Sequence, residues 1–186
     1  MFSLRSLFRT PPETQTAQTL YAATIHAARR PDFYTVLGVP DTPEGRFEIL
    51  ALMAFLLLRR LKSEDAAKDV SQAYFDVMFD DIDSNLRELG VGDISVGKKV
   101  KKLAESFYGR IKAYEEALAA PADDMLGHAL TRYPYRGAEP AQAHITTLSA
   151  YVRDADADLA AQDVARLLDG HVTFAPIDVP TEEGRT

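Results

Sequence analysis

The sequence predicts an all-α protein, a single compact multi-helix domain of about six helices with an irregular C-terminal tail. Apolar residues recur at steps of three and four along most of the chain, and no convincing alternating pattern of a β-strand occurs. Proline and glycine stand at the ends of several of these periodic stretches. With 186 residues, 46% of them apolar, the chain can bury one real core.

The division of the chain follows from the extent of this pattern. We expect a flexible N-terminal segment over residues 1–12, the α-helical domain over 13–170 and an irregular tail over 171–186. The longest apolar run, 49–58, is about half of the roughly 20 residues that cross a bilayer, so it predicts a core helix. The first residues lack the apolar stretch and cleavage site of a secretory signal. These features favour a cytoplasmic protein.

Proline marks the end of the first helix and the start of the second. The first is expected over 13–29, because Pro31 pushes the residue before it out of helical geometry. The apolar connection that follows, up to Asp41, should pack against the domain. Thr42 and Pro43 then form a start signal, a capping hydroxyl followed by a residue pre-set for the first turn.

The second helix, over 43–62, is apolar on every face in its middle. Such a helix is either surrounded by other helices or presents an apolar groove to a partner, and the buried core is the favoured interpretation. The third helix is expected over 66–89, with Gly90 as its left-handed stop. A fourth helix over 96–119 should be capped by Ser95.

The last third of the chain continues in the same manner. A fifth helix is expected over 122–132, followed by a turn over 133–137 and one long or broken helix over 140–168.

The net charge of −7 hides a separation of charge along the chain. Residues 63–94 carry a balance of −7, whereas residues 95–112 carry a balance of +5. The lysines crowd the first turns of the fourth helix, where cations meet the positive end of the helix dipole. Such lysines call for an anionic partner. It is either the acidic third helix or an external RNA, lipid or protein.

Signatures of catalysis and of metal binding are missing from the sequence. There is no cysteine, and the four histidines are scattered without metal-ligand spacing. The run Gly92 to Lys99 resembles a nucleotide-binding loop, but Lys99 stands where a magnesium-binding hydroxyl is required. We therefore expect no enzyme activity and no cofactor.

Several strings in fixed order over about residues 20–120 resemble the ubiquinol-cytochrome c chaperone family. The strings that carry the resemblance are Gly38-Val-Pro-Asp-Thr42, Gly45-Arg-Phe47, Arg59-Arg-Leu61, Asn85-Leu-Arg-Glu88, Gly90-Val-Gly-Asp93, Lys98-Lys-Val-Lys101 and Phe107-Tyr-Gly-Arg110. The short stretch before the first helix favours a free-living bacterial member. The small second subunit of the mitochondrial relatives is not implied here.

The resemblance implies a non-catalytic assembly chaperone. It would bind newly synthesised cytochrome b and assist biogenesis of ubiquinol-cytochrome c reductase, the respiratory complex III. Two alternatives remain from the residues alone: a ribosome- or RNA-associated module, or a peripheral membrane module at the inner face of the cell membrane.

A holding function predicts three groups of residues. The first is an apolar surface that binds the client: Phe33, Tyr34, Phe47, Leu52 and Phe55. The second is a basic rim that meets the ribosome or membrane: Arg59, Arg60, Lys98, Lys99, Lys101 and Lys102. The third is a polar network, interpreted as buried and as setting helix junctions, with surface recognition as the alternative: Asp41, Thr42, Arg46, Asn85, Arg87, Glu88 and Asp93.

Overall fold

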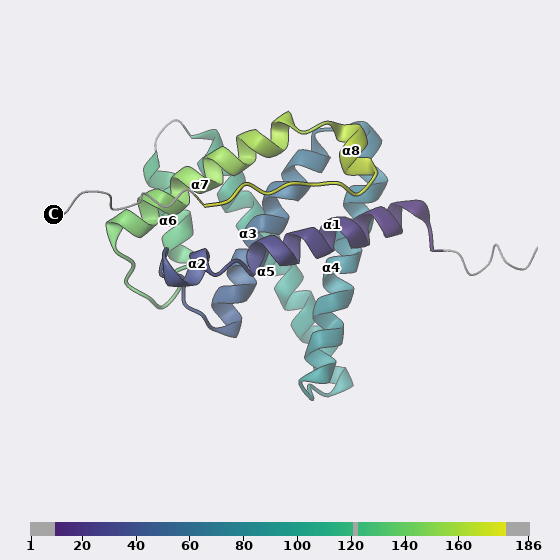
Figure 1. Cartoon of the computed structure of the whole chain (residues 1–186). Helices are drawn as coiled ribbons and strands as arrows, with labels where there is room; N and C mark the ends of the chain where they lie inside the picture. The colour runs from purple at the N-terminus through teal and green to yellow at the C-terminus, as the bar shows by residue number, and fades with distance from the viewer. Residues whose placement is uncertain (1–9, 121–122, 178–186) are drawn as a thin grey trace, which may run out of the picture.

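The chain folds as helices packed around one central helix, as the sequence predicts (Figure 1). The computed structural model describes residues 10–120 and 123–177, and no strand occurs among them. The helices are α1 (Pro12–Ala28), α2 (Asp32–Thr35), α3 (Pro43–Lys62), α4 (Lys68–Glu88), α5 (Asp93–Ala119), α6 (Asp123–Arg132), α7 (Gln142–Ala161) and α8 (Val164–Leu168). A short 3-10 turn, η2 (Asp65–Ala67), leads into α4.

Helix α3 is the centre of the fold. It contacts α1, α4, α5 and α7, and every residue from Ala51 to Leu57 is buried. Its residues supply both apolar clusters: Leu52 and Phe55 face the cluster with α5, α6 and α7, whereas Ala54 belongs to the cluster with α1 and α4. A helix that is apolar all round is stable in water only with neighbours on all sides. The buried-core interpretation of 43–62 is therefore confirmed.

The start of α3 forms as the sequence predicts. The Thr42 hydroxyl accepts a hydrogen bond from the Gly45 N–H at 3.1 Å, which caps the helix. Gly45 is required here, since a Cβ at this position would lie 1.9 Å from the Pro40 carbonyl oxygen. The preceding connection packs as expected, with Phe33 and Leu37 buried, and four of its residues form α2.

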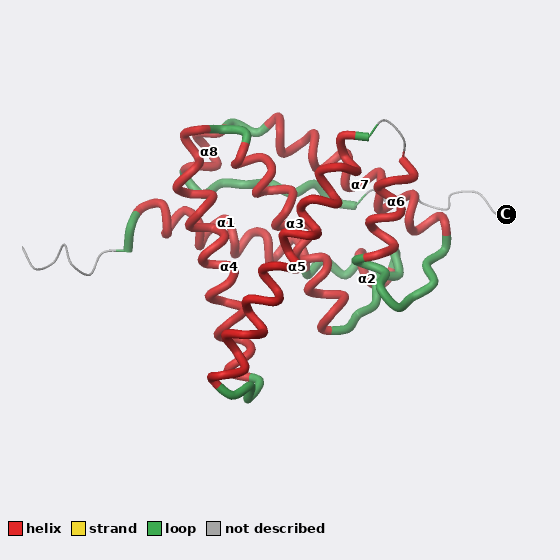
Figure 2. The backbone as a smooth tube through the Cα atoms, turned by 180° about the vertical axis from the view of Figure 1, so that it is seen from behind, coloured by secondary structure: helices red, strands yellow, loops and turns green. Residues whose placement is uncertain are grey.

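Helices α4 and α5 form an antiparallel hairpin whose turn projects away from the rest of the domain (Figures 1 and 2). Gly90 closes α4 with φ of +79°, in the left-handed region that favours glycine. The expected cap at Ser95 is wrong. Helix α5 begins three residues earlier than expected, at Asp93, and Gly92 is its cap residue, so Ser95 lies inside the first turn.

The last third of the described chain covers α3 from the other side. The expected long or broken helix is broken: α7 ends at Ala161, and the Asp163 carboxylate caps α8 by accepting from the Ala165 N–H at 3.0 Å. Residues 171–177 then run without regular secondary structure across the α1 and α7 side of the domain, and we call them the strap (Figure 1). Ile177 within it is buried.

The central position of α3 predicts an asymmetric response to truncating leucine. Leu52→Ala should lower the free energy of unfolding by about 2–5 kcal/mol, because it leaves a cavity in the core. Leu89→Ala, at an 80% exposed leucine of the α4–α5 turn, should change it by less than about 0.5 kcal/mol. Urea denaturation measures both values, and similar losses in the two variants would contradict the arrangement.

Candidate functional site

Three of the five residues expected to bind a client lie in the core instead. Phe33, Leu52 and Phe55 are 0%, 0% and 1% exposed. The ring of Phe33 packs edge-on against Tyr151 at 5.4 Å, and that of Phe55 lies 5.3 Å from Tyr114. The expectation of an exposed apolar surface at these residues is wrong for this conformation, because neighbouring helices cover Leu52 and Phe55 of α3 and Tyr151 of α7 packs on Phe33 of α2.

The other two apolar candidates are half-buried. The Tyr34 hydroxyl donates to the Ala28 carbonyl at 2.8 Å, and burial raises its pKa above the ordinary value. The guanidinium of Arg46 lies 5.9 Å from the Tyr34 ring, and that of Arg110 lies 5.5 Å from the Phe47 ring. Both rings are therefore covered in part by arginine, and neither is an open apolar surface.

The residues of the expected polar network are exposed and lie in two separate places. At the start of α3, Arg46 binds Asp41 through two hydrogen bonds of 2.6 and 3.2 Å, with side chains 62% and 55% exposed. The hydrogen bonds from Arg46 hold the pKa of Asp41 below its ordinary value. Thr42 caps the same helix.

The second group lies at the α4–α5 turn. Arg87 binds Asp83 on its own helix and Asp93 at the start of α5, and so links the two arms of the hairpin. The Asn85 amide donates to the Asp81 carbonyl at 2.8 Å, and Glu88 is exposed. The expectation of burial is wrong because a two-helix projection has too little surrounding protein to cover its polar side chains.

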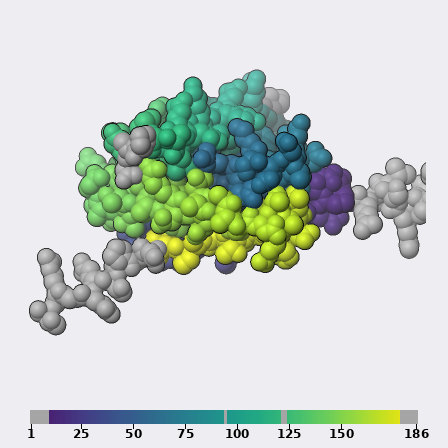
Figure 3. Space-filling model, turned by 90° about the horizontal axis from the view of Figure 1, so that it is seen from above, coloured from purple at the N-terminus to yellow at the C-terminus, as the bar shows by residue number. Residues whose placement is uncertain are grey.

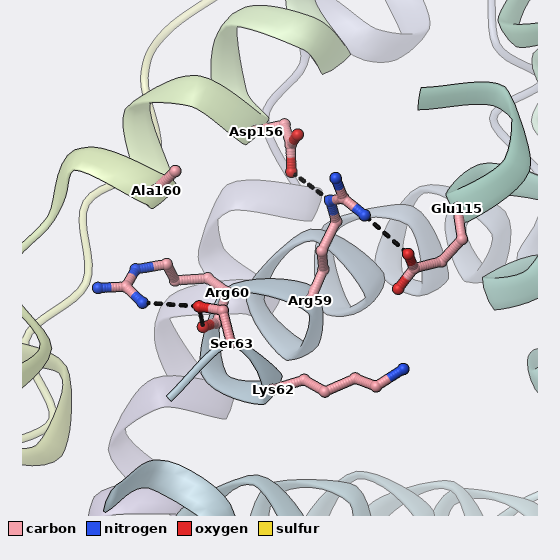
Figure 4. Close-up of a pocket in the computed structure, with 7 residues that line it drawn as sticks. All are labelled: Arg59, Arg60, Lys62, Ser63, Glu115, Asp156 and Ala160. Atoms are coloured by element: carbon pink, nitrogen blue, oxygen red, sulfur yellow. Dashed lines mark hydrogen bonds and ion pairs between the residues drawn. The ribbon is translucent and has the colours of Figure 1, made fainter. Parts of the chain in front are cut away.

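Two arginines expected in a basic rim instead tie neighbouring segments together, and Figure 4 shows the contacts of Arg59 with Glu115 and Asp156. Arg59 binds Glu115 of α5 at 2.7 Å and Asp156 of α7 at 2.9 Å, across a hollow of about 370 Å³. Arg60 binds Glu64 at 2.8 Å and the Gln162 carbonyl at 2.9 Å, and its side chain is 9% exposed. With their charges matched locally, Arg59 and Arg60 do not form a free cationic rim.

The lysines of the expected rim form no contact ion pairs. Lys98, Lys99, Lys101 and Lys102 are exposed, and none forms an ion pair or hydrogen bond with a residue that the structure describes. The acidic helix α4 packs beside α5 without a salt bridge to any of the four. We call these four residues the lysine cluster. Their ammonium groups are therefore accessible to an external anionic partner.

Tyr108 extends this surface in a way that sequence reasoning missed. Its ring is 58% exposed and stacks on Phe75 of α4 at 5.5 Å and 28°. It follows Lys101 by seven residues, two helical turns, and precedes Lys112 by four, so the three lie on one side of α5. The helical spacing to the lysines was a readable signal, but only the contact with Phe75 shows that the ring is held in place.

A buried ion pair between α5 and α3 was also missed. Arg110 of α5 binds Glu48 of α3 through both carboxylate oxygens, and the two side chains are each 6% exposed. Burial alone would lower the pKa of Arg110, but its hydrogen bonds with Glu48 and the charge of Glu48 raise it above the ordinary value. The sequence places Glu48 among apolar residues, and this was the available signal.

The described residues offer neither a metal-binding cluster nor a membrane-spanning helix. Within residues 10–120 and 123–177, no group of three or more histidine, aspartate or glutamate side chains could hold a metal ion. The run Gly92 to Lys99 opens a helix that follows another helix, which is not the context of a nucleotide-binding loop. No helix in the described part of the chain is long and apolar enough to cross a membrane.

The ion pair Glu48–Arg110 predicts a large effect from breaking one side of it. Arg110→Ala should lower the free energy of unfolding by about 3–5 kcal/mol, because it leaves the Glu48 carboxylate buried without its partner. The double variant Glu48→Leu, Arg110→Met should recover most of that loss. Lys112→Ala, an exposed change on the same helix, is the control, and an equal effect there in urea denaturation would contradict the assignment.

Three comparisons place these features among known proteins. A model of the family described as ubiquinol-cytochrome C chaperone matches residues 35–174. The ubiquinol-cytochrome-c reductase complex assembly factor 1 of Xenopus laevis is 24% identical over 117 residues, 62% of this chain. The match spans 58% of the length of that relative. The crystal structure of the Cbp3 homolog from Brucella abortus is 38% identical, with a TM-score of 0.81, over 94% of this chain and 98% of the other.

Proposed function

The chain belongs to the ubiquinol-cytochrome c chaperone family, and from this premise we propose that it is a non-catalytic holder of newly synthesised cytochrome b. The observation that carries the proposal is the family match over 35–174, which covers the described helices from α3 to α8. The agreement in fold with the Cbp3 homolog over 94% of the chain supports it. Such a holder assists assembly of the respiratory complex III and needs no cofactor of its own.

A holder of this kind acts through binding surfaces. Cytochrome b exposes apolar helices until it is inserted and assembled, so its chaperone must shield apolar groups from water. It must also be present where the client emerges, at the ribosome or the membrane. The lysine cluster is suited to the second task, because an exposed, unpaired cationic surface is attracted to anionic lipid or to ribosomal RNA.

The negative charge of the rest of the protein should orient the molecule on an anionic surface. The net charge is −7, so an anionic surface repels most of the molecule and attracts the side of α5 that carries the lysines. Tyr108 adds an aromatic side chain with a polar end, which is suited to a membrane interface and to stacking on a nucleic-acid base. We place the protein in the cytoplasm, in part bound peripherally to the inner face of the cell membrane.

Client binding can be tested by crosslinking in cells. Proteins crosslinked to the chain during a short pulse of labelled amino acids should include cytochrome b. After the pulse, the amount of labelled cytochrome b crosslinked to the chain should fall as complex III assembles. A strain without the protein should accumulate less cytochrome b. Normal cytochrome b in that strain, or attachment only to soluble enzymes, would contradict the proposal.

The lysine cluster can be tested with a charge-matched pair of variants. Lys98→Glu, Lys102→Glu should weaken binding to anionic vesicles or to ribosomes, because neutralising two lysines alone removes about 2 kcal/mol, roughly 30-fold in affinity. Lys62→Glu, Lys68→Glu makes the same change in net charge at exposed lysines elsewhere and should bind nearly as the wild type does.

Sedimentation at several salt concentrations measures this binding, which should weaken as salt rises. Vesicles with and without anionic lipid, compared with purified ribosomes, identify the anionic surface. Equal binding by the two double variants would show that the lysine cluster is no anchor.

A further inference from the structure

The described surface exposes few large apolar side chains, and they lie on different elements. The large apolar side chains exposed on it are Leu89, Tyr108 and Met125, and they belong to the α4–α5 turn, α5 and α6. Single exposed apolar side chains that are not grouped together are common on the surface of soluble proteins. If the chain holds an apolar client, its apolar surface must be covered in the empty state and uncovered for binding.

The strap covers such a surface. Val172 and Phe174 pack against both apolar clusters, and Ile177 is 6% exposed within the cluster that contains Phe33. In Figure 1 the strap crosses the domain beside α1 and α7, and Figure 3 shows its atoms at the surface along the edge of α7. Apolar side chains of a segment without secondary structure thus fill the space between two helices.

Few bonds hold the strap in place. The Gln162 amide forms two hydrogen bonds with the backbone of Thr173, donating to its carbonyl at 2.7 Å and accepting from its N–H at 3.0 Å. Arg30 donates to the Ala175 carbonyl. Only one backbone-to-backbone hydrogen bond joins residues 171–177 to the rest of the described chain, from His171 to the Arg166 carbonyl.

The helices around it are held differently. A helix can leave the core only by exposing a full apolar face, whereas the strap can leave after the bonds of Gln162 and Arg30 break. Segments with few backbone hydrogen bonds open at the low end of the local unfolding free energies of a protein. Arg30 stays in place, because its guanidinium lies 5.4 Å from the rings of both Phe33 and Tyr151.

We propose that the surface under the strap, between α1 and α7, is where an apolar segment of the membrane-protein client binds, in exchange for the strap. This inference rests on the proposed holding function. The strap shows what the surface accepts, namely an extended segment with apolar side chains at Val172, Phe174 and Ile177. Exposing that surface beside Phe33 makes part of the buried core available to a client. In the empty protein the strap keeps it out of water.

This exchange makes the position of the strap a determinant of affinity. The apparent Kd for the client is the intrinsic Kd divided by the fraction of molecules with the strap open. Weakening the attachment at Gln162 should tighten binding, and fixing the strap in place should weaken it. Other surface changes should do neither.

The chain has no cysteine, so one engineered pair can serve both purposes. Gln162→Cys, Thr173→Cys removes the amide clamp, and a short bis-maleimide then joins the same two positions covalently. The full-length variant is measured before and after bridging, with reagent-treated Thr173→Cys as the control. The probes are detergent-solubilised cytochrome b apoprotein, an apolar fluorescent dye, and hydrogen exchange of the amides in 171–177.

Before bridging, we expect faster hydrogen exchange in 171–177, more bound dye and about tenfold tighter binding of cytochrome b. The gain in affinity cannot exceed the reciprocal of the fraction of wild-type molecules whose strap is open. After bridging, all three should fall below the wild-type values, while exchange in α3 stays unchanged and shows an intact fold. A bridged protein that binds dye and cytochrome b as the wild type does overturns the exchange but leaves the holding function standing. If no form binds cytochrome b, the holding function fails, and the dye and the amides still decide whether the strap opens over an apolar surface.

Discussion

The structure depends on keeping one helix away from water on every side. Helix α3 carries its apolar residues around its whole circumference, so α1, α4, α5 and α7 must each bury a face against it. The neighbouring helices differ in how much of their length packs against α3. Helices α4 and α5 pack on α3 over part of their length and continue beyond it as a hairpin, and this continuation carries the lysine cluster. The requirement to bury α3 therefore also produces a projection that is free for contacts with other molecules.

Arginine and lysine have different places in this arrangement. Arg59, Arg60 and Arg110 tie α3 to surrounding elements through carboxylates and a backbone carbonyl, and Arg30 ties α1 to the strap and to α7. The planar guanidinium can make several hydrogen bonds at fixed angles and lie against aromatic rings, so it suits crowded junctions. The lysine cluster lies on the projecting hairpin, where a hydrated ammonium group remains in solvent. Positive charge thus serves cohesion in the body of the protein and is available to partners on the hairpin.

A holder of apolar clients faces two opposing demands. An open apolar surface binds the client but promotes association of the empty protein, whereas a closed core is soluble but cannot bind. In the described structure the core is closed, and the large apolar side chains that could bind a client are buried in it. A weakly bonded segment over that core reconciles the two demands, because the free energy of opening is small compared with that of unfolding a helix. Such a segment makes affinity depend on an equilibrium within the chain itself.

The sequence by itself determined the helical class, the extent of α3, its Thr42 cap and the left-handed stop at Gly90, because these depend on neighbours within one or two turns. It also determined that four lysines crowd the start of α5. Only the tertiary structure decided which charged groups have partners: Arg59 meets Asp156 across 97 residues of chain, and the lysine cluster meets no described residue. It likewise decided that Phe33, Leu52 and Phe55 are covered and that the strap covers part of the same core. Burial and ion pairing depend on segments that are distant in sequence, and spacing along a single helix does not encode them.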